Sequence, residues 1–427
     1  MIKICVVGAG YVGLTTSAAL AEFGNEVQCV DIEQSKINML NQGLIPIYEP
    51  GLGELIQKNV QQGKLHFSFD VKDSIKNNSI ILIAVGTPPK EDGSSDLSYI
   101  NNIVDTIVST IQDYKIVITK STVPPGTNEW IHQIFLDMGI DETMFDIVSN
   151  PEFLREGMAL WDIFHPNKIV FGTKTNRPIK VLKKLYEGGR APLIFTSLTG
   201  AEMIKYASNA FLATKISFAN EIARICDAYN VEYLDVAKGL GTDSRIGRHF
   251  LNAGLGFGGS CLPKDLSSLK HSALRKNVDT KLLDAVLEVN DSQIELYLKK
   301  LNTLLPDLAG KKITVWGVTF KPNTDDLRFS PSIALINELI NKGARVHTYD
   351  PIVQLQLPST CSHTDQYESI SNSDALIIAT EWEQFCDSNW ADVKSRMSRS
   401  IILDARNCLD GETIRKNGLV YLGVGKQ

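Results

Sequence analysis

The feature that most constrains the fold of this chain is the stretch VVGAGYVG near its start, which places Gly8, Gly10 and Gly13 directly after an apolar run. Glycines at this spacing predict a tight turn between a β-strand and a helix, where the backbone can approach a pyrophosphate and the helix packs closely on the strand. The free N–H groups at the start of that helix then face the anion. The sequence therefore predicts a dinucleotide-binding unit at this point.

Asp31 makes the prediction specific for NAD. It ends the next apolar run, eighteen residues after Gly13. A carboxylate at this position accepts hydrogen bonds from both ribose hydroxyls of NAD and repels the additional phosphate of NADP. Thr87 and Thr122 lie in loops that follow two further apolar strands, where doubly wound folds bind ligands. Ordinary turn chemistry of proline and glycine is the alternative explanation for these two loops.

The order of elements predicts the fold class. Over the first 120 residues, apolar runs that read as buried parallel strands alternate with helical stretches, and DIVSNPEFL and NKIVFGT read as further strands that extend this domain to about residue 198. A long helical pattern then begins at Thr199, with apolar residues on more than one face, which is typical of the centre of a multidomain chain or a dimer. A second α/β segment begins at KKITVWGVTFK. We expect an α/β fold of two Rossmann-like doubly wound domains joined by a central helical segment with a long helix, divided at residues 1–198, 199–300 and 301–427.

Composition excludes several classes of protein. Of the 427 residues, 43% are hydrophobic and 22% charged, which is typical of a globular protein, and the net charge of -6 argues against a nucleic-acid binder. No apolar run reaches the roughly 18 residues that span a bilayer, and no signal peptide is evident, so we expect a cytoplasmic protein with no membrane contact. The seven cysteines are widely spaced without a C-x-x-C pair, which predicts neither disulfides nor zinc.

Cys261 lies in the unusual stretch GFGGSCLPKD. A metal site would need three or four ligands, and the nearby chain offers only His249 and Asp265, so no metal is predicted. A small buried role is the usual one for cysteine, and it is expected for the other six. Here, however, glycines allow a ligand to approach, and Lys264 favours the nucleophilic thiolate. Together with NAD, such a thiolate can trap an aldehyde as a thiohemiacetal and carry it to a thioester that water hydrolyses.

Further groups can serve the same chemistry. Lys205 and Asn209 are four residues apart in the long helical pattern, and therefore on one face, where both can donate hydrogen bonds to an oxyanion. A solvent-facing helix surface is the alternative. Glu152 and Glu156, in NPEFLREG, can activate a water or bind substrate hydroxyls, although such carboxylates are also common on helix surfaces.

Seven motifs, in order along the whole chain, resemble those of the nucleotide-sugar 6-dehydrogenases, most closely the UDP-glucose branch: GAGYVGL, PIYEPGL, KSTVPPGT, NPEFLREG, KYASNAFLATKISFANEI, DSRIGRHFLNAGLGFGGSCLPKD and FKPNTDDLRFSPS. The resemblance implies oxidation of the C6 alcohol of UDP-glucose to the carboxylate of UDP-glucuronate, with two NAD and one water consumed. It also implies a C-terminal domain that helps to hold the UDP-sugar, and a homodimer built around the long central helix.

The resemblance also implies roles for single residues. Cys261 matches the nucleophile, and Lys205 with Asn209 the pair that stabilises oxyanionic intermediates. Asp265 matches the carboxylate that assists proton removal through a water, and Glu152 the residue tied to thioester hydrolysis. Thr122 and Glu156 match cofactor-side and water-positioning groups. The implied cofactor contacts are Gly8, Gly10, Tyr11, Val12, Gly13, Asp31, Lys36, Thr87, Thr122, Glu156, Lys264 and Arg328. The implied substrate contacts are Glu152, Phe153, Leu154, Arg155, Glu156, Lys205, Asn209, Arg245, Phe250, Leu251, Asn252, Ala253, Gly254, Gly258 and Lys321, with Arg245 resembling an arginine offered across a dimer interface.

Three positions depart from or qualify this resemblance. Leu262 stands where many UDP-glucose enzymes have phenylalanine and GDP-mannose enzymes often have leucine. Lys168 replaces a usual arginine, and Ser260 argues against the N-acetylhexosamine branch. The alternatives are therefore a GDP-mannose 6-dehydrogenase, a single-step dehydrogenase of the hydroxyacyl or phosphogluconate type, and an NAD-binding regulatory module without chemistry. The last is disfavoured by the intact set of reactive residue types around Cys261.

Overall fold

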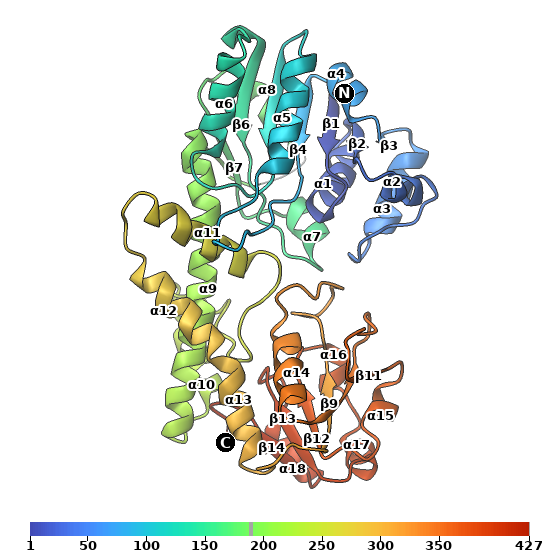
Figure 1. The fold of residues 1–427 in the computed structure, drawn as a ribbon, viewed down its shortest axis with the longest axis vertical. Helices are drawn as coiled ribbons and strands as arrows, with labels where there is room; N and C mark the ends of the chain where they lie inside the picture. Colours follow the sequence, from blue (N-terminus) through green and yellow to red (C-terminus); the bar gives the residue numbers. More distant parts are fainter. Residues whose placement is uncertain (188–190, 427) are drawn as a thin grey trace. The chain divides into compact units, whose positions relative to one another are not determined.

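The computed structural model describes residues 1–187 and 191–426 (Figure 1). The chain divides into two compact units. The first comprises Met1–Ser208 with Ser267–Val278, and the second comprises Asn209–Leu266 with the residues from Asp279 onward. The long helix α9, Leu198–Ala228, contributes its first residues to the first unit and the rest to the second. The three-domain division at residues 198 and 300 stays a prediction.

The first unit is built on an eight-stranded sheet in the order β3-β2-β1-β4-β5-β6-β7-β8. Its strands are β1 Lys3–Val7, β2 Glu26–Val30, β3 Leu65–Ser68, β4 Ile80–Ile83, β5 Lys115–Thr119, β6 Phe145–Ser149, β7 Ile169–Thr173 and β8 Leu193–Thr196. All neighbours are parallel except β6 and β7, which run antiparallel. Both strands were expected from the sequence, but it was not predicted that this pair would be antiparallel. The segment between them contains the helix α7, Ala159–Phe164, which packs against α1, Tyr11–Glu22.

Helices cover both faces of this sheet (Figure 1). They are α1 Tyr11–Glu22, α2 Gln34–Asn41, α3 Leu52–Gln61, α4 Val71–Asn77, α5 Ser98–Thr110, α6 Thr127–Asp137, the 3-10 helix η1 Glu142–Met144, α7 Ala159–Phe164 and α8 Ile179–Leu185. Successive residues of a strand point to opposite faces. In β1, Ile4 and Val6 therefore enter one apolar core while Cys5 and Val7 enter the other. This double layer explains the continuous apolar runs in the sequence.

The second unit holds a six-stranded, wholly parallel sheet in the order β11-β10-β9-β12-β13-β14. Its strands are β9 Lys312–Trp316, β10 Arg345–Tyr349, β11 Thr360–His363, β12 Ala375–Ile378, β13 Ile401–Asp404 and β14 Val420–Leu422. Its surrounding helices are α14 Pro331–Asn341, α15 Gln366–Ser369, α16 Glu383–Cys386, α17 Trp390–Arg396 and α18 Gly411–Lys416. Val315 packs into one core and Trp316 into the other, again on opposite faces.

Helices of the central segment connect the two sheets along the chain. Besides α9 they are α10 Tyr233–Thr242, α11 Leu262–Leu274, α12 Lys281–Asp291 and α13 Gln293–Asn302. Among the residues that the structure describes, none of the helices combines the length and apolar character needed to cross a bilayer. The predicted fold class, two Rossmann-like sheets with a long helix in the central segment, is confirmed.

Candidate active site

The glycine turn after β1 has the shape that a dinucleotide requires. A Cβ on Gly8, whose φ is +108°, would lie 2.6 Å from the carbonyl oxygen of Ala84, and one on Gly13 would lie 1.8 Å from that of Gly8. Gly10 has no neighbouring atom within 4 Å of its Cβ position. The first and third glycines thus allow close packing, whereas the second leaves open space at the N-terminus of α1. That space fits the pyrophosphate of NAD.

Asp31 is fixed beside this turn. Its Oδ2 accepts a hydrogen bond from the backbone N–H of Ala9 at 2.8 Å, and its Oδ1 accepts one from that of Glu33 at 3.0 Å. Lys36 lies 3.4 Å from the same carboxylate and 3.0 Å from the carboxylate of Glu33. Asp31 and Lys36, two predicted cofactor residues, therefore come together at the end of β2. The carboxylate is oriented by the glycine turn itself, where a ribose would lie.

The loops that follow β4 and β5 also meet at this edge of the sheet. Thr87 is buried, and its hydroxyl donates to the carbonyl oxygen of Thr122 at 2.9 Å. The hydroxyl of Ser121 donates to the carbonyl oxygen of Val85 at 2.7 Å. The structure thus joins the two predicted threonines in one loop cluster, and the residues of this edge fit NAD as a ligand.

Glu49 is a buried residue of this region that the sequence analysis missed. The hydroxyl of Tyr11 donates to Glu49, whose carboxylate also accepts the backbone N–H groups of Gly157 and Ala159, each at 2.7 Å. Glu49 therefore holds the segment around Glu156 onto the glycine turn. Its motif, PIYEPGL, was recognised only as part of the resemblance. A single glutamate in a proline-containing loop gives no periodic signal of such a role.

Glu152 and Lys205 form a buried ion pair in the first unit. Lys205 Nζ donates to Glu152 Oε1 at 2.9 Å, and the other carboxylate oxygen accepts the N–H of Leu154 at 2.6 Å. Burial by itself would raise the pKa of Glu152, but the charge and hydrogen bond of Lys205, with the Leu154 N–H and the charge of Lys120, hold that pKa below its usual value. The carboxylate is therefore ionised at neutral pH.

Phe153 lies among cations beside this pair. Its ring centroid is 4.4 Å from Lys168 Nζ and 5.5 Å from Lys205 Nζ. Burial and the charge of Lys205 lower the pKa of Lys168, whose Nζ donates to Ser208 at 3.1 Å. Lys168, which replaces a usual arginine, thus occupies this cationic cluster. Arg155, by contrast, pairs with Asp162 at 2.6 Å.

Asp265 is the centre of a second buried group, in the second unit. Asn209 Nδ2 donates to its Oδ2 at 2.6 Å, and Lys264 Nζ donates to its Oδ1 at 2.6 Å. The side chain of Asp265 is 1% exposed. Four of the predicted residues, Asn209, Cys261, Lys264 and Asp265, therefore gather at the start of α11. The positive charge of Lys264 is paired with the carboxylate of Asp265.

Cys261 itself precedes the first residue of α11 and is exposed. Its carbonyl oxygen accepts the N–H of Asp265 at 2.9 Å, the first turn of that helix. Its Sγ lies 3.6 Å from the hydroxyl of Ser260. The positive end of the helix dipole therefore stabilises negative charge at this position. An exposed cysteine at a helix N-terminus is placed to react rather than to fill a core.

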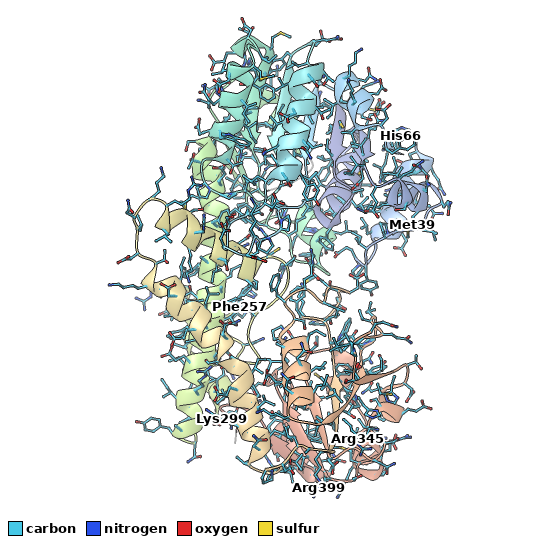
Figure 2. The ribbon with its side chains drawn as sticks, in the orientation of Figure 1. Met39, His66, Phe257, Lys299, Arg345 and Arg399 are labelled. Atoms are coloured by element: carbon cyan, nitrogen blue, oxygen red, sulfur yellow. The ribbon has the colours of Figure 1, made fainter. Side chains whose placement is uncertain are left out.

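The backbone before Cys261 is held by residues that the sequence analysis also missed. Asn290 Oδ1 accepts the N–H of Phe257, labelled in Figure 2, at 2.8 Å, and Asn220 Oδ1 accepts the N–H of Gly254 at 2.7 Å. Arg406 donates to the carbonyl oxygen of Gly256 at 3.1 Å. These three holders come from distant parts of the chain. No local pattern in the sequence marks them.

The remaining predicted residues differ in how far they are exposed and in what they contact. Leu251 and Ala253 are buried, so only their backbone can face a ligand, whereas Phe250 and Asn252 are exposed. Arg245, with its side chain 87% exposed, pairs with Asp243, and Arg328 pairs with Asp326. Lys321 Nζ lies 5.8 Å from the ring centroid of Phe320. Val12, Leu154 and Glu156 are half-buried.

Three domain models of one protein family match this chain in order. Residues 2–189 match the NAD binding domain of the UDP-glucose/GDP-mannose dehydrogenase family, residues 199–292 its central domain and residues 314–411 its UDP binding domain. The chain belongs to the UDP-glucose/GDP-mannose dehydrogenase family. It is an NAD-dependent dehydrogenase, and the predicted cofactor and the resemblance to this family are confirmed.

Individual relatives in the family span the whole chain. A putative UDP-glucose 6-dehydrogenase of Bacillus subtilis is 47% identical over 99% of this chain and 100% of its own. The structure of a UDP-glucose dehydrogenase from Pyrobaculum islandicum is similar with a TM-score of 0.93 and 34% identity, covering 100% of this chain and 98% of its own. A UDP-D-ManNAc dehydrogenase structure from Pyrococcus horikoshii reaches a TM-score of 0.90 at 28% identity, covering 100% and 99%. The fold is thus shared by family members named for different sugars.

Proposed function

We propose that this dehydrogenase oxidises UDP-glucose to UDP-glucuronate in two steps, with Cys261 as the nucleophile. The observation that carries the proposal is the exposed Cys261 thiol at the N-terminus of α11, in one turn with the buried carboxylate of Asp265. A dehydrogenase that stops at the aldehyde or ketone has no use for such a thiol. The match to a UDP binding domain and the names of the UDP-glucose relatives support this substrate.

The first oxidation converts the C6 alcohol to an aldehyde. NAD, when bound at the glycine turn, accepts one hydride in each oxidation, so two are reduced for each sugar. Asp265 takes the hydroxyl proton through a water, because its carboxylate is buried and oriented by Asn209 and Lys264. The ammonium of Lys205 and the amide of Asn209 donate to the oxyanion that develops.

The second oxidation keeps the sugar covalently bound. Cys261 Sγ attacks the aldehyde carbon and forms a thiohemiacetal, whose oxidation at the same carbon gives a thioester. Water then attacks the thioester carbon, the C–S bond breaks, and the carboxylate and the Cys261 thiol are released. Glu152, ionised and held by Lys205, orients that water. Per sugar, one water is consumed and the alcohol carbon loses four electrons in total.

A stoichiometric assay tests the two-step reaction. A limiting amount of UDP-glucose is oxidised to completion, and NADH is counted by absorbance. We expect two NADH for each sugar. One NADH with an aldehyde product would contradict the proposal and favour a single-step dehydrogenase.

A Cys261→Ser variant tests the nucleophile. It should form no carboxylate, while its affinity for NAD, measured by calorimetry, stays within about twofold. Unchanged turnover would refute the assignment of Cys261 as the nucleophile.

The sugar nucleotide is tested side by side with its alternatives. Leu262 leaves GDP-mannose as the second candidate, so kcat/KM is measured for UDP-glucose, UDP-galactose, UDP-N-acetylmannosamine and GDP-mannose. We expect UDP-glucose to exceed the others by about 10²-fold or more, because buried polar groups left unpaired by the wrong ligand are costly. A preference for GDP-mannose would reassign the substrate and leave the cysteine chemistry in place.

We also propose that the enzyme is a homodimer joined through α9. Phe211, Phe218 and Ile225 are 65%, 49% and 48% exposed, and they recur every seven residues. Such spacing places them on one stripe of the helix. A stripe of large apolar side chains on the surface is typical of an interface between protein chains.

We also propose that the enzyme acts in the cytoplasm. Reaction through a reduced thiol at Cys261 fits this location, because thiols are kept reduced there.

A further inference from the structure

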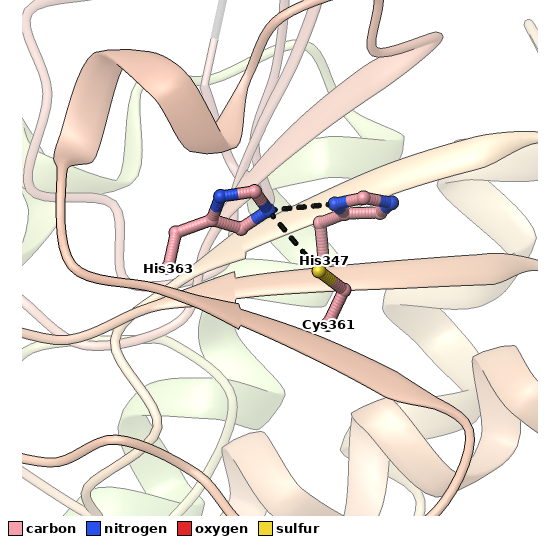
Figure 3. A group of neighbouring side chains, drawn as sticks. All are labelled: His347, Cys361 and His363. Atoms are coloured by element: carbon pink, nitrogen blue, oxygen red, sulfur yellow. Dashed lines mark hydrogen bonds between the residues drawn. The ribbon is translucent and has the colours of Figure 1, made fainter.

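A cluster of metal-ligating side chains lies far along the chain from the residues assigned to the dehydrogenase reaction. His347 is on β10, and Cys361 and His363 are on the neighbouring strand β11 (Figure 3). His347 is paired in register with Cys361, and His363 follows two residues later on the same face. The three side chains therefore converge above the edge of the second unit's sheet.

The distances within the cluster are those of a compact ligand set. His347 Nδ1 lies 2.8 Å from His363 Nε2, and Cys361 Sγ lies 3.6 Å from the same nitrogen. All three ligand atoms lie within 4.8 Å of one another. In a tetrahedral zinc site with ordinary bond lengths, two nitrogens stand roughly 3.3 Å apart, and nitrogen and sulfur roughly 3.6 Å. Cys361 Sγ and His363 Nε2 already have this spacing, and the two imidazole nitrogens must move apart by about half an ångström.

We propose that His347, Cys361 and His363 bind one divalent transition-metal ion, with Zn²⁺ the best match, and that a water completes the tetrahedron. Two imidazoles and a thiolate are borderline-to-soft donors that suit Zn²⁺ and its neighbours in the transition series, whereas Mg²⁺ and Ca²⁺ prefer oxygen. A three-ligand set with an open fourth position is a common way to hold zinc.

The charges around the cluster have opposing effects. Burial, with the charges of Lys312 and Arg345 and the neighbouring His363, lowers the pKa of His347 to about 4, and burial and Lys312 also lower the pKa of His363. Both rings are therefore neutral at pH 7 and keep a lone pair for a metal. The same two cations repel a divalent ion, while Glu368, whose charge acts on His363, attracts it, as Cys361 does once the metal has displaced its proton. Arg345 is labelled in Figure 2.

The site would have a structural consequence. β11 is one of the two edge strands of its sheet and, among the described residues, pairs with β10 alone. A metal bound by both strands would cross-link this edge. No metal was expected from the sequence, because the chain near Cys261 offers too few ligands and no C-x-x-C pair is present, and Cys361 was expected to be buried. The structure corrects the second point, because Cys361 is exposed. The pairing of two strands brings His347 to Cys361 and His363, which lie fourteen and sixteen residues further along the chain.

Cobalt binding tests the proposal directly. The full-length, tag-free chain carrying Cys261→Ser, which removes the other exposed thiol, is stripped with a chelator and titrated with Co²⁺. We expect one Co²⁺ per chain, with thiolate-to-cobalt charge-transfer absorption and the intense visible bands of tetrahedral cobalt, both displaced by Zn²⁺. We also expect Zn²⁺ to raise the melting temperature, because it binds the folded state.

Matched variants distinguish this cluster from adventitious binding. In the same background, Cys361→Ser should abolish the charge-transfer band, and His347→Ala or His363→Ala should weaken Co²⁺ binding by about 100-fold or more. His66→Ala, at an exposed histidine labelled in Figure 2, and Cys386→Ser should leave binding unchanged. Cys361 is exposed, so its substitution leaves the fold intact, as circular dichroism will check. Absence of the thiolate band in the parent, or its survival in Cys361→Ser, would overturn the proposal.

Discussion

At the scale of single residues, the pairing of Glu152 with Lys205 sets what each can do. Each is nearly fully buried, and a buried charge left without its partner is destabilising by about 3–5 kcal/mol. Glu152 with a lowered pKa is a weak base, so it can serve thioester hydrolysis by orienting a water rather than by removing its proton outright. The last chemical step should therefore depend on it more than the earlier ones do.

Glu152→Gln tests this role. The amide cannot orient the water as the carboxylate does, and we expect kcat to fall by about 10²- to 10⁴-fold while a thioester accumulates on Cys261. Rapid quenching followed by mass spectrometry of the intact chain will detect the added sugar nucleotide. Glu54→Gln, at an exposed glutamate on α3, is the control and should turn over normally. A slow variant that carries no adduct would place Glu152 at an earlier step.

The same pair predicts a pH dependence of stability. The pKa of Glu152 is lower in the folded protein than its usual value of 4.5. Its contribution to the free energy of unfolding is therefore fully present above pH 4.5, and it is lost as the pH falls through the lowered value. Urea unfolding between about pH 6 and about pH 3 should show a smaller loss of stability in Glu152→Gln than in the parent. Equal losses in both proteins would mean that the pair does not titrate with folding.

At the scale of elements, the glycine-rich stretch before Cys261 depends on close packing. A Cβ on Gly258 would lie 2.2 Å from the carbonyl oxygen of Phe329, a backbone atom that cannot move away without shifting its loop. We expect Gly258→Ala to destabilise the protein by about 1–3 kcal/mol and to reduce kcat/KM, as overpacking does. Thermal unfolding and steady-state kinetics measure both effects.

Gly239 offers a matched control on a nearby part of the chain. It lies inside α10, and no atom stands within 4 Å of its Cβ position. Gly239→Ala should therefore stabilise the protein slightly, by up to about 1 kcal/mol, because alanine is the better helix former. If both substitutions had the same effect, the contact with Phe329 would not be the cause.

The elements also show what a sequence can and cannot predict. The long apolar runs predicted β1, β4, β5, β6 and β9 because each is buried on both faces and so leaves a continuous signal, whereas β2 was predicted although one of its faces is only half-buried. The short strands β3, β8, β11 and β14 were missed, because three to four residues that include exposed positions give no clear period. The antiparallel pairing of β6 and β7 was also missed. Their pairing depends on the path of a connecting segment, which no residue pattern encodes.

The candidate site shows the same contrast. Gly8, Gly10 and Asp31 were predicted because a local turn and a fixed spacing define their roles. Glu49, Asn290 and Arg406 hold the site from distant parts of the chain, by hydrogen bonds to backbone groups. Such contacts arise only once the chain has folded. The reactive groups proposed here could therefore be proposed from the sequence alone, whereas the groups that hold the backbone around them could not.

At the scale of the whole molecule, the exposed stripe on α9 bears on assembly. Phe211, Phe218 and Ile225 are 65%, 49% and 48% exposed, so covering the exposed part of each would stabilise an interface by about half of the roughly 1.5–3 kcal/mol that full burial gives. In a symmetric dimer the same stripe is contributed by both chains, so six side chains are covered and the sum is about 5–9 kcal/mol. That sum is comparable with the estimated 4–15 kcal/mol cost of association, so neighbouring contacts must add to it.

In a two-fold symmetric dimer each substitution is present in both chains, so a single change at α9 has a large effect on dimerisation. Phe218→Glu places two carboxylates at the centre of the stripe, and we expect it to weaken dimerisation by about 10³-fold or more through desolvation and like-charge repulsion. Light scattering after gel filtration should then give the mass of one chain, against twice that mass for the parent. Val420→Glu, at an exposed valine on the edge strand β14, should leave the parent's mass unchanged. A monomeric parent, or a variant that stays dimeric, would contradict assembly through α9. If the variant is monomeric as expected, its activity will show whether a residue from the second chain, such as Arg245, is needed for turnover.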